Sequence, residues 1–171
     1  MRIFLTGFMG SGKSQTGPAL AKQFHSCFAD LDIVIEQKNK KSVPEIFSLS
    51  GEETFREMER KCLQELIENN HDIVLSTGGG TPCFYDNMQL MNNSGITIYL
   101  RLPCDILFNR LKKTKMQRPL IADYSNKNLL HFIHQKLKER EKFYMQSRLT
   151  VDALTIKPDK LEQLIRLEME K

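Results

Sequence analysis

The sequence contains few cysteines, and they lie far apart. The four are Cys27, Cys62, Cys83 and Cys104, and no two of them form a C-x-x-C pair. This spacing argues against a zinc site or a redox motif built on such a pair. We therefore expect free, mostly buried thiols in a reducing cytosol. The first predicted strand begins at Arg2, which leaves no room for a signal peptide and likewise favours a cytoplasmic protein.

Long apolar runs and a strong charge imbalance are also lacking. No run approaches the length needed to span a bilayer, so we expect no membrane partner. The net charge is only +4, from 25 Lys and Arg against 21 Asp and Glu. The densest basic clusters, residues 38–41 and 112–115, are better explained as solvated faces than as nucleic-acid sites. These features favour small anionic ligands over a nucleic-acid partner.

The chain has no internal repeat, low-complexity tract or flexible linker, so its 171 residues are expected to form a single domain. Helical patterns alternate with β-type runs at Arg2–Thr6, Cys27–Asp30, Asp72–Ser76, Gly95–Arg101 and Leu149–Ala153. This alternation predicts an α/β fold in which a five-stranded parallel sheet lies between two layers of helices. Ligands bind at the carboxyl ends of such strands, where residues 7–14, 30–32 and 78–80 are expected to meet.

The most informative segment is Gly7–Ser14, which matches G-x-x-x-x-G-K-S, the phosphate-binding P-loop. A strand pattern precedes it and a helical pattern follows, which distinguishes it from a chance glycine-rich turn. Lys13 would bring a positive charge to the β- and γ-phosphates, and Ser14 would offer Mg²⁺ a hydroxyl oxygen. The expected ATP-binding residues here are Gly10, Ser11, Gly12, Lys13 and Ser14 of this segment and Gln15 directly after it.

Asp30 and Asp32 lie two residues apart at the predicted end of the second strand, so both side chains are expected on one face. If that strand neighbours the first, both carboxylates reach the P-loop. One could then bind Mg²⁺ and the other orient an acceptor hydroxyl and take its proton; a pair of solvated turn aspartates is the alternative. The third strand lacks the acid of an ordinary P-loop ATPase, and no N-K-x-D guanine signature occurs. Both absences favour a small-molecule or nucleotide kinase.

Two arginines are candidates for gripping the acceptor. A capping box at residues 50–53 predicts a helix on which Arg56 and Glu59 share a face. Either Arg56 grips a planar carboxylate or hydroxyls while Glu59 holds it in place, or the two form an ordinary surface pair. Arg140 belongs to a helix predicted over residues 127–146, on the apolar stripe that contains Leu130, Ile133, Leu137 and Tyr144. A charge on that stripe needs a partner, which is either a buried carboxylate of the protein or an anionic substrate.

Three glycines and a long loop complete the candidate site. Gly78, Gly79 and Gly80 would let backbone N–H groups approach a small ligand, unless they form only a flexible turn. Residues 114–126 lack periodicity and predict a loop of the kind that serves as a lid. In that loop Arg118 would close over the γ-phosphate or remain a mobile surface residue, and Arg110 before it could flank an adenine ring.

These motifs occur in the order found in shikimate kinases, which the chain resembles from Ile3 to about Tyr144. The shared elements are G-x-x-G-x-G-K-S at 7–14, D-x-D at 30–32, F-R-x-x-E at 55–59, S-T-G-G-G at 76–80, R-P-L at 118–120 and R-x-x-x-Y at 140–144. The resemblance implies a P-loop kinase domain over residues 1–171. Its lid would lie at about 114–126, and its substrate-binding helical region at about 33–62.

The resemblance also implies a reaction, the Mg²⁺- and ATP-dependent phosphorylation of the 3-hydroxyl of shikimate in aromatic amino-acid biosynthesis. By motif match, Lys13 and Arg118 would act on the transferring phosphoryl group. Ser14 and Asp30 would hold Mg²⁺, and Asp32 would bind the substrate hydroxyls and serve as the base. These matches make Lys13, Asp32 and Arg118 the expected catalytic residues.

The alternative functions differ mainly in the molecule that accepts the phosphoryl group. In the resemblance, Arg56 and Arg140 would grip the shikimate carboxylate, with Gly78–Gly80 lining the site. A related kinase with another acceptor, such as gluconate or a nucleoside monophosphate, stays open, as does a catalytically silent module that binds a ligand or a partner protein. A P-loop assembly ATPase is disfavoured by the missing acid after the third strand. Since no exposed apolar stripe stands out, we expect a monomer with ATP and shikimate as its partners.

Overall fold

A parallel sheet forms the centre of the protein. The structure, a computed structural model, describes residues 1–114 and 124–170. Its strands are β1 (Arg2–Thr6), β2 (Cys27–Asp30), β3 (Ile73–Ser76), β4 (Ile96–Arg101) and β5 (Leu149–Asp152), all parallel, in the order β2-β3-β1-β4-β5. The predicted strand ends are correct to within one residue. This agreement confirms the α/β fold with a five-stranded parallel sheet.

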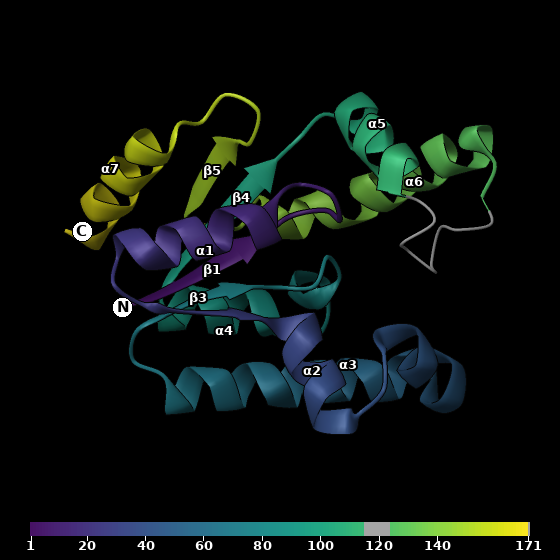
Figure 1. Cartoon of the computed structure of the whole chain (residues 1–171), viewed down its shortest axis with the longest axis horizontal. Coiled ribbons are helices and arrows are strands. Elements are labelled where there is room, and N and C mark those ends of the chain that lie inside the picture. Colours follow the sequence, from purple (N-terminus) through teal and green to yellow (C-terminus); the bar gives the residue numbers. More distant parts are fainter. Residues whose placement is uncertain (115–123, 171) are drawn as a thin grey trace.

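Helices cover both faces of the sheet (Figure 1). They are α1 (Lys13–Gln23), α2 (Leu31–Asn39), α3 (Val43–Asn69), α4 (Asn87–Ser94), α5 (Cys104–Thr114), α6 (Asn126–Tyr144) and α7 (Pro158–Met169), with a short 3-10 helix η1 (Thr81–Cys83) after β3. Successive residues of β1 point to opposite faces of the sheet, as in any β-strand. Ile3 and Leu5 pack with α1 and α7, whereas Phe4 packs with α2, α3 and α4. The sheet is therefore the middle of three layers.

Helices α3 and α6 agree with their predicted patterns in part. In α3 the predicted start at residues 50–53 coincides with a kink at Gly51, whose backbone angles are not helical, and the helical segment that contains Arg56 follows it. As a whole α3 begins earlier, at Val43, with a capping box made by Ser42 and Glu45. In α6 the buried side chain is Leu129, while Leu130 is 44% exposed. The stripe of α6 therefore begins one residue earlier than predicted.

The cysteines, the lengths of the helices and the predicted lid bear on three further predictions. All four cysteines are free as predicted, but they are not mostly buried: only Cys62 is buried, Cys83 and Cys104 are half-buried, and Cys27 is exposed. In the described ranges, 1–114 and 124–170, no helix is both long and apolar enough to cross a bilayer. The predicted lid, residues 114–126, and Arg118 within it fall mainly outside the described residues.

Candidate active site

The P-loop joins β1 to α1 at the carboxyl edge of the sheet. Gly12, which precedes α1, has φ 105°, a conformation that side chains other than hydrogen disfavour. Lys13 opens the helix, and its Nζ donates hydrogen bonds of 2.8 Å to Gly7 O and 3.1 Å to Phe8 O. The lysine charge is thus held across the mouth of the loop, at the place where phosphate oxygens would enter.

A cavity of about 580 Å³ opens in front of this loop. Of the residues predicted to bind ATP, it is lined by Gly10, Gly12, Lys13, Ser14, Gln15 and Arg110. Arg110 also donates a 3.1 Å hydrogen bond to Gly10 O, which ties α5 to the P-loop. Ser11 is not brought into the lining: its side chain is 2% exposed and its N–H donates to Phe8 O. We call this space the nucleotide cavity.

Ser14 and Asp30 place two side-chain oxygens next to each other at one wall of the nucleotide cavity. Ser14 Oγ donates a 2.9 Å hydrogen bond to Asp30 Oδ2. Mg²⁺ prefers hard oxygen ligands and is commonly bound through few protein groups together with substrate phosphates. Within the described residues no cluster of three or more His, Cys, Asp or Glu could hold a metal by itself. The donor pair fits a magnesium ion that arrives with a nucleotide.

Asp32 is positioned at the site by a helix and not, as predicted, by a strand. It lies in the first turn of α2 and not on the strand, and β2 neighbours β3 rather than β1. Asp30, the last residue of β2, caps α2 by accepting a 3.2 Å hydrogen bond from Asp32 N–H. The two carboxylates therefore converge because one caps the helix that carries the other, and not through strand alternation.

Asp32 has an unusual electrostatic environment. The pKa of its carboxyl is raised from 3.8 to about 6, chiefly by burial and secondly by the nearby Glu59 and Asp30 carboxylates, while Lys13 lowers it. Desolvation and like charges both disfavour the ionised form. A carboxyl with a pKa near the working pH is suited to exchange a proton with a reacting hydroxyl.

A second cavity, of about 250 Å³, adjoins the first, and we call it the acceptor cavity. Its lining includes all six predicted substrate-binding residues, which are Asp32, Arg56, Gly78, Gly79, Gly80 and Arg140. Asp32, Gly79 and Met9 line both cavities. The wall shared by the two cavities thus contains the carboxyl with the raised pKa.

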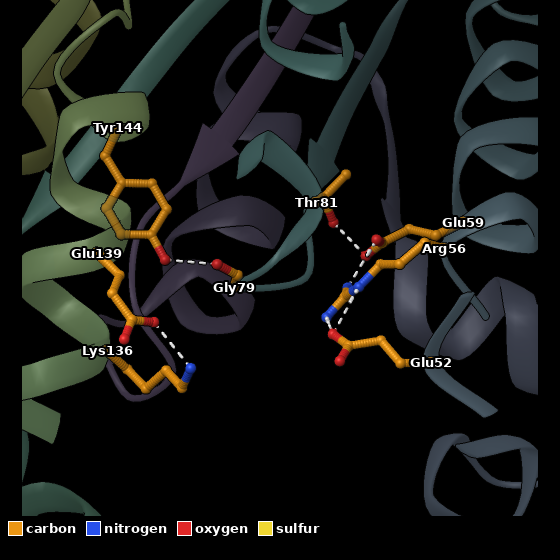
Figure 2. A network of polar contacts seen from close by, with 8 residues as sticks. All are labelled: Glu52, Arg56, Glu59, Gly79, Thr81, Lys136, Glu139 and Tyr144. Carbon is orange, nitrogen blue, oxygen red and sulfur yellow. Dashed lines mark hydrogen bonds and ion pairs between the residues drawn. The ribbon is translucent and has the colours of Figure 1, made fainter. Parts of the chain in front are cut away.

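Arg56 is held by a network of carboxylates (Figure 2). Its Nη1 donates to Glu59 Oε2 at 2.8 Å and its Nη2 to Glu52 Oε1 at 3.1 Å. Thr81 Oγ1 donates to the other oxygen of Glu59 at 2.5 Å. The predicted role of Glu59 in holding Arg56 is confirmed, and a surface ion pair is excluded because Glu59 is 0% exposed.

Three phenylalanine rings surround the same guanidinium. The Arg56 Cζ lies 4.1 Å from the centroid of Phe84, 5.2 Å from that of Phe55 and 5.7 Å from that of Phe47. Contacts of this kind attract a cation to the ring face. Together with the ion pairs they leave Arg56 a single orientation at the edge of the acceptor cavity.

Arg140 faces the acceptor cavity from α6. Its Cζ lies 5.9 Å from the centroid of Phe8, and no carboxylate of the described part of the chain forms an ion pair with it. One turn later, Tyr144 donates a 2.5 Å hydrogen bond to Gly79 O (Figure 2). Burial raises the pKa of Tyr144, so its hydroxyl stays protonated as a donor.

Two of the three glycines, Gly78 and Gly80, are needed by the protein's own side chains. A Cβ on Gly80 would lie 2.7 Å from both Arg56 Nη atoms, and one on Gly78 would lie 2.8 Å from Glu59 Oε1 and 2.9 Å from Asp32 Oδ1. Only hydrogen fits at these positions. The sequence predicts that these glycines let a ligand approach. The structure adds a second reason for them, which is the lack of space for a Cβ beside the protein's own side chains.

Several residues of the two cavities were not predicted. The acceptor cavity also has Glu36 and Phe47 in its lining. Outside the lining, Thr81 donates a hydrogen bond to Glu59, the ion-pair partner of Arg56, and the ring of Phe84 contacts the Arg56 guanidinium. Their contacts join segments that are distant in sequence, so no local motif marks them. Arg118, predicted to act on the phosphoryl group, is outside the described residues.

Comparisons with known proteins agree on one family. The family model described as "Shikimate kinase" matches residues 9–167. A shikimate kinase from Bacteroides fragilis is 46% identical over 168 residues, which cover 98% of this chain and 90% of that relative. The crystal structure of shikimate kinase from Bacteroides thetaiotaomicron has a TM-score of 0.88 at 42% identity and covers 99% of this chain and 97% of that one.

A further solved structure, shikimate kinase from Acinetobacter baumannii in complex with shikimate, has a TM-score of 0.87 at 32% identity. The match covers 99% of this chain and 95% of that one. Sequence and fold thus agree over nearly the whole length, and the chain belongs to the shikimate kinase family, a family of ATP-dependent kinases.

Proposed function

We propose that the protein transfers the γ-phosphoryl group of ATP to the 3-hydroxyl of shikimate, giving shikimate 3-phosphate and ADP. The observation that carries this proposal is the wall shared by the two cavities. Asp32 and Gly79 line both, with Lys13 on the nucleotide side and Arg56 and Arg140 on the acceptor side. A group bound in one cavity is thereby brought next to a group bound in the other.

The acceptor cavity suits a small polyol with one carboxylate. Arg56 and Arg140 offer guanidinium donors that match a planar carboxylate, and Asp32 offers an acceptor for hydroxyl groups. The relative from Acinetobacter baumannii, solved with shikimate, supports this choice of ligand. A nucleoside monophosphate would require a region that reads a base, which the lining of this small cavity does not resemble.

The transfer step follows from positioning and charge. Asp32 orients the acceptor hydroxyl and takes its proton as the oxygen attacks the γ-phosphorus, and the bond from the γ-phosphorus to the β-γ bridging oxygen of ATP breaks. Lys13 and the loop N–H groups neutralise the developing charge. Arg118 is proposed to add a further charge, and the segment around it to exclude water as a competing acceptor.

Ser14 and Asp30 are proposed to hold Mg²⁺. The 2.9 Å contact between their oxygens places two hard ligands side by side on the nucleotide cavity. The bound ion would screen the charge of the phosphate oxygens. Substituting Asp30 should therefore raise the concentration of Mg²⁺ needed for half-maximal turnover.

The test is coupled release of ADP from ATP and Mg²⁺, with shikimate, gluconate or no acceptor in parallel reactions. Turnover that depends on shikimate supports the proposal. Turnover that depends on gluconate would move the acceptor to another carboxylated polyol. ATP binding without turnover on either acceptor would indicate a silent binding module.

A further inference from the structure

We infer that Thr81 is a positioning residue for the acceptor: its hydroxyl holds Glu59, and through Glu59 it fixes the guanidinium of Arg56. This inference rests on the proposed function, because the consequence is measured as shikimate binding. Thr81 follows the three glycines and opens η1, and its side chain does not line the acceptor cavity. Its effect would therefore be exerted through the two residues between it and the ligand.

Thr81 is itself rigidly placed. It is 0% exposed, its N–H donates to Gly78 O at 3.2 Å, and its carbonyl accepts a 3.0 Å hydrogen bond from Asn87 Nδ2. Asn87 is also 0% exposed, and it accepts a 2.9 Å hydrogen bond from Arg60. The hydroxyl of Thr81 is thus a fixed donor and not one that adapts to a moving carboxylate.

Glu59 divides its two oxygens between two donors. Oε2 accepts from Arg56 at 2.8 Å and Oε1 accepts from Thr81 at 2.5 Å, and no solvent reaches the side chain. A buried carboxylate oxygen that loses its donor is costly, so without Thr81 the carboxylate would turn towards another donor. Turning would break its alignment with Arg56.

Near Gly78, repulsion between carboxylates would also displace Glu59 if the Thr81 hydroxyl were removed. The point where a Gly78 Cβ would stand is 2.8 Å from Glu59 Oε1, 2.9 Å from Asp32 Oδ1 and 3.0 Å from Thr81 Oγ1. Glu59 Oε1 and Asp32 Oδ1 therefore both lie close to one point, and Thr81 donates its hydroxyl proton to Glu59 Oε1 there. Removing that proton leaves repulsion to push Glu59 out of place.

Glu59 is the contact that decides the orientation of Arg56. The other carboxylate partner, Glu52, is 58% exposed at its side chain, and an ion pair open to solvent holds a guanidinium weakly. The phenylalanine rings attract the cation but supply no directional acceptor. Loss of the Thr81 hydroxyl should therefore change the orientation of the Arg56 guanidinium before it affects other groups of the acceptor cavity.

The experiment compares Thr81→Val with Thr97→Val by steady-state kinetics. Thr97 is a matched control, since it is also 0% exposed and also donates a 2.5 Å hydrogen bond, to Asn92, but it lies in β4 outside both cavities. We expect T81V to raise the KM for shikimate about tenfold with the KM for ATP unchanged, and T97V to change neither. T81S, which restores the hydroxyl, should return the shikimate KM to within about twofold of wild type.

A second comparison tests the route through Arg56. In an Arg56→Ala background, T81V should cause no further loss of kcat/KM for shikimate, because the group through which it acts is gone. Should T81V fail to fold, Thr81→Ala removes the same hydroxyl without crowding and takes its place.

An unchanged shikimate KM in T81V, equal rises for shikimate and ATP, or a full further loss on the Arg56→Ala background would each overturn the inference. Absence of shikimate-dependent turnover in the wild-type protein would instead refute the proposed function, before any variant is made.

Discussion

Replacing Asp32 by Asn should lower turnover sharply and at the same time stabilise the fold. The pKa of Asp32 is raised from 3.8 to about 6, chiefly by burial and secondly by Glu59. A raised pKa means that the folded protein binds this proton more tightly than the unfolded chain does. The stability that Asp32 contributes is therefore complete below about pH 4 and is lost as the pH rises through about 6.

The size of the effect follows from the two pKa values. The difference between 3.8 and about 6 corresponds to about 3 kcal/mol of stability lost by pH 8. At pH 5, between the two values, about half of that loss has occurred. Asn carries no charge at either pH, so D32N should exceed wild type by about 3 kcal/mol at pH 8 and by about half as much at pH 5.

Urea unfolding of both proteins at pH 8 and pH 5, without nucleotide or metal, measures these differences. D72N is a control of opposite sign, because an ion pair with the N-terminus lowers the pKa of the exposed Asp72, and its removal should slightly destabilise the protein. Turnover of D32N should fall at least about a hundredfold, as expected for the loss of a general base. A D32N protein that is no more stable than wild type at pH 8 would refute this account of the Asp32 environment.

The remaining predictions concern single residues on either side of Asp32. Lys13→Ala should abolish turnover while thermal unfolding still shows a folded protein, and a wild-type kcat would remove Lys13 from the mechanism. Arg56→Ala and Arg140→Ala should each raise the KM for shikimate and leave the KM for ATP nearly unchanged; the reverse pattern would mean that the acceptor cavity is misassigned. Tyr144→Phe removes the hydrogen bond to the Gly79 carbonyl and should raise the shikimate KM severalfold. The ring of Tyr99 contacts that of Tyr144, and Tyr99→Phe loses only a 3.5 Å contact to Glu141 and should leave the shikimate KM unchanged. Equal effects of the two variants would exclude a role for the Gly79 contact.

The strands and the P-loop could be predicted because their signals are local. A β-branched run, a glycine-rich turn and a helical pattern each occupy a few consecutive residues, and each was found at its predicted place. Arg56 and Glu59 belong to the same class. Their spacing of three along a helix requires no knowledge of the remaining fold, and their ion pair was predicted correctly.

Contacts that depend on sheet order were harder to predict. Asp32 was expected to reach the P-loop from a strand beside β1, but β3 lies between β1 and β2. The residue still lines both cavities, because the cap formed by Asp30 begins α2 at the correct point. The prediction was right about the place and wrong about its physical reason.

Long-range contacts of the acceptor cavity were not predictable at all. Thr81 and Glu59 are 22 residues apart, and only the packing of η1 against α3 brings them together. The prediction that Leu130 is buried was wrong for a similar reason, because helical periodicity fixes the position of an apolar stripe only to within a residue. The buried residue is its neighbour Leu129. Tertiary packing decides such positions.

The most direct test of the central claim is observation of the product by ³¹P NMR in a mixture of protein, ATP, Mg²⁺ and shikimate. The account predicts a new phosphate-monoester resonance that grows as the γ-phosphate resonance of ATP declines, and that is absent when shikimate is omitted. Growth of inorganic phosphate alone, or of an ester only when gluconate replaces shikimate, would contradict it.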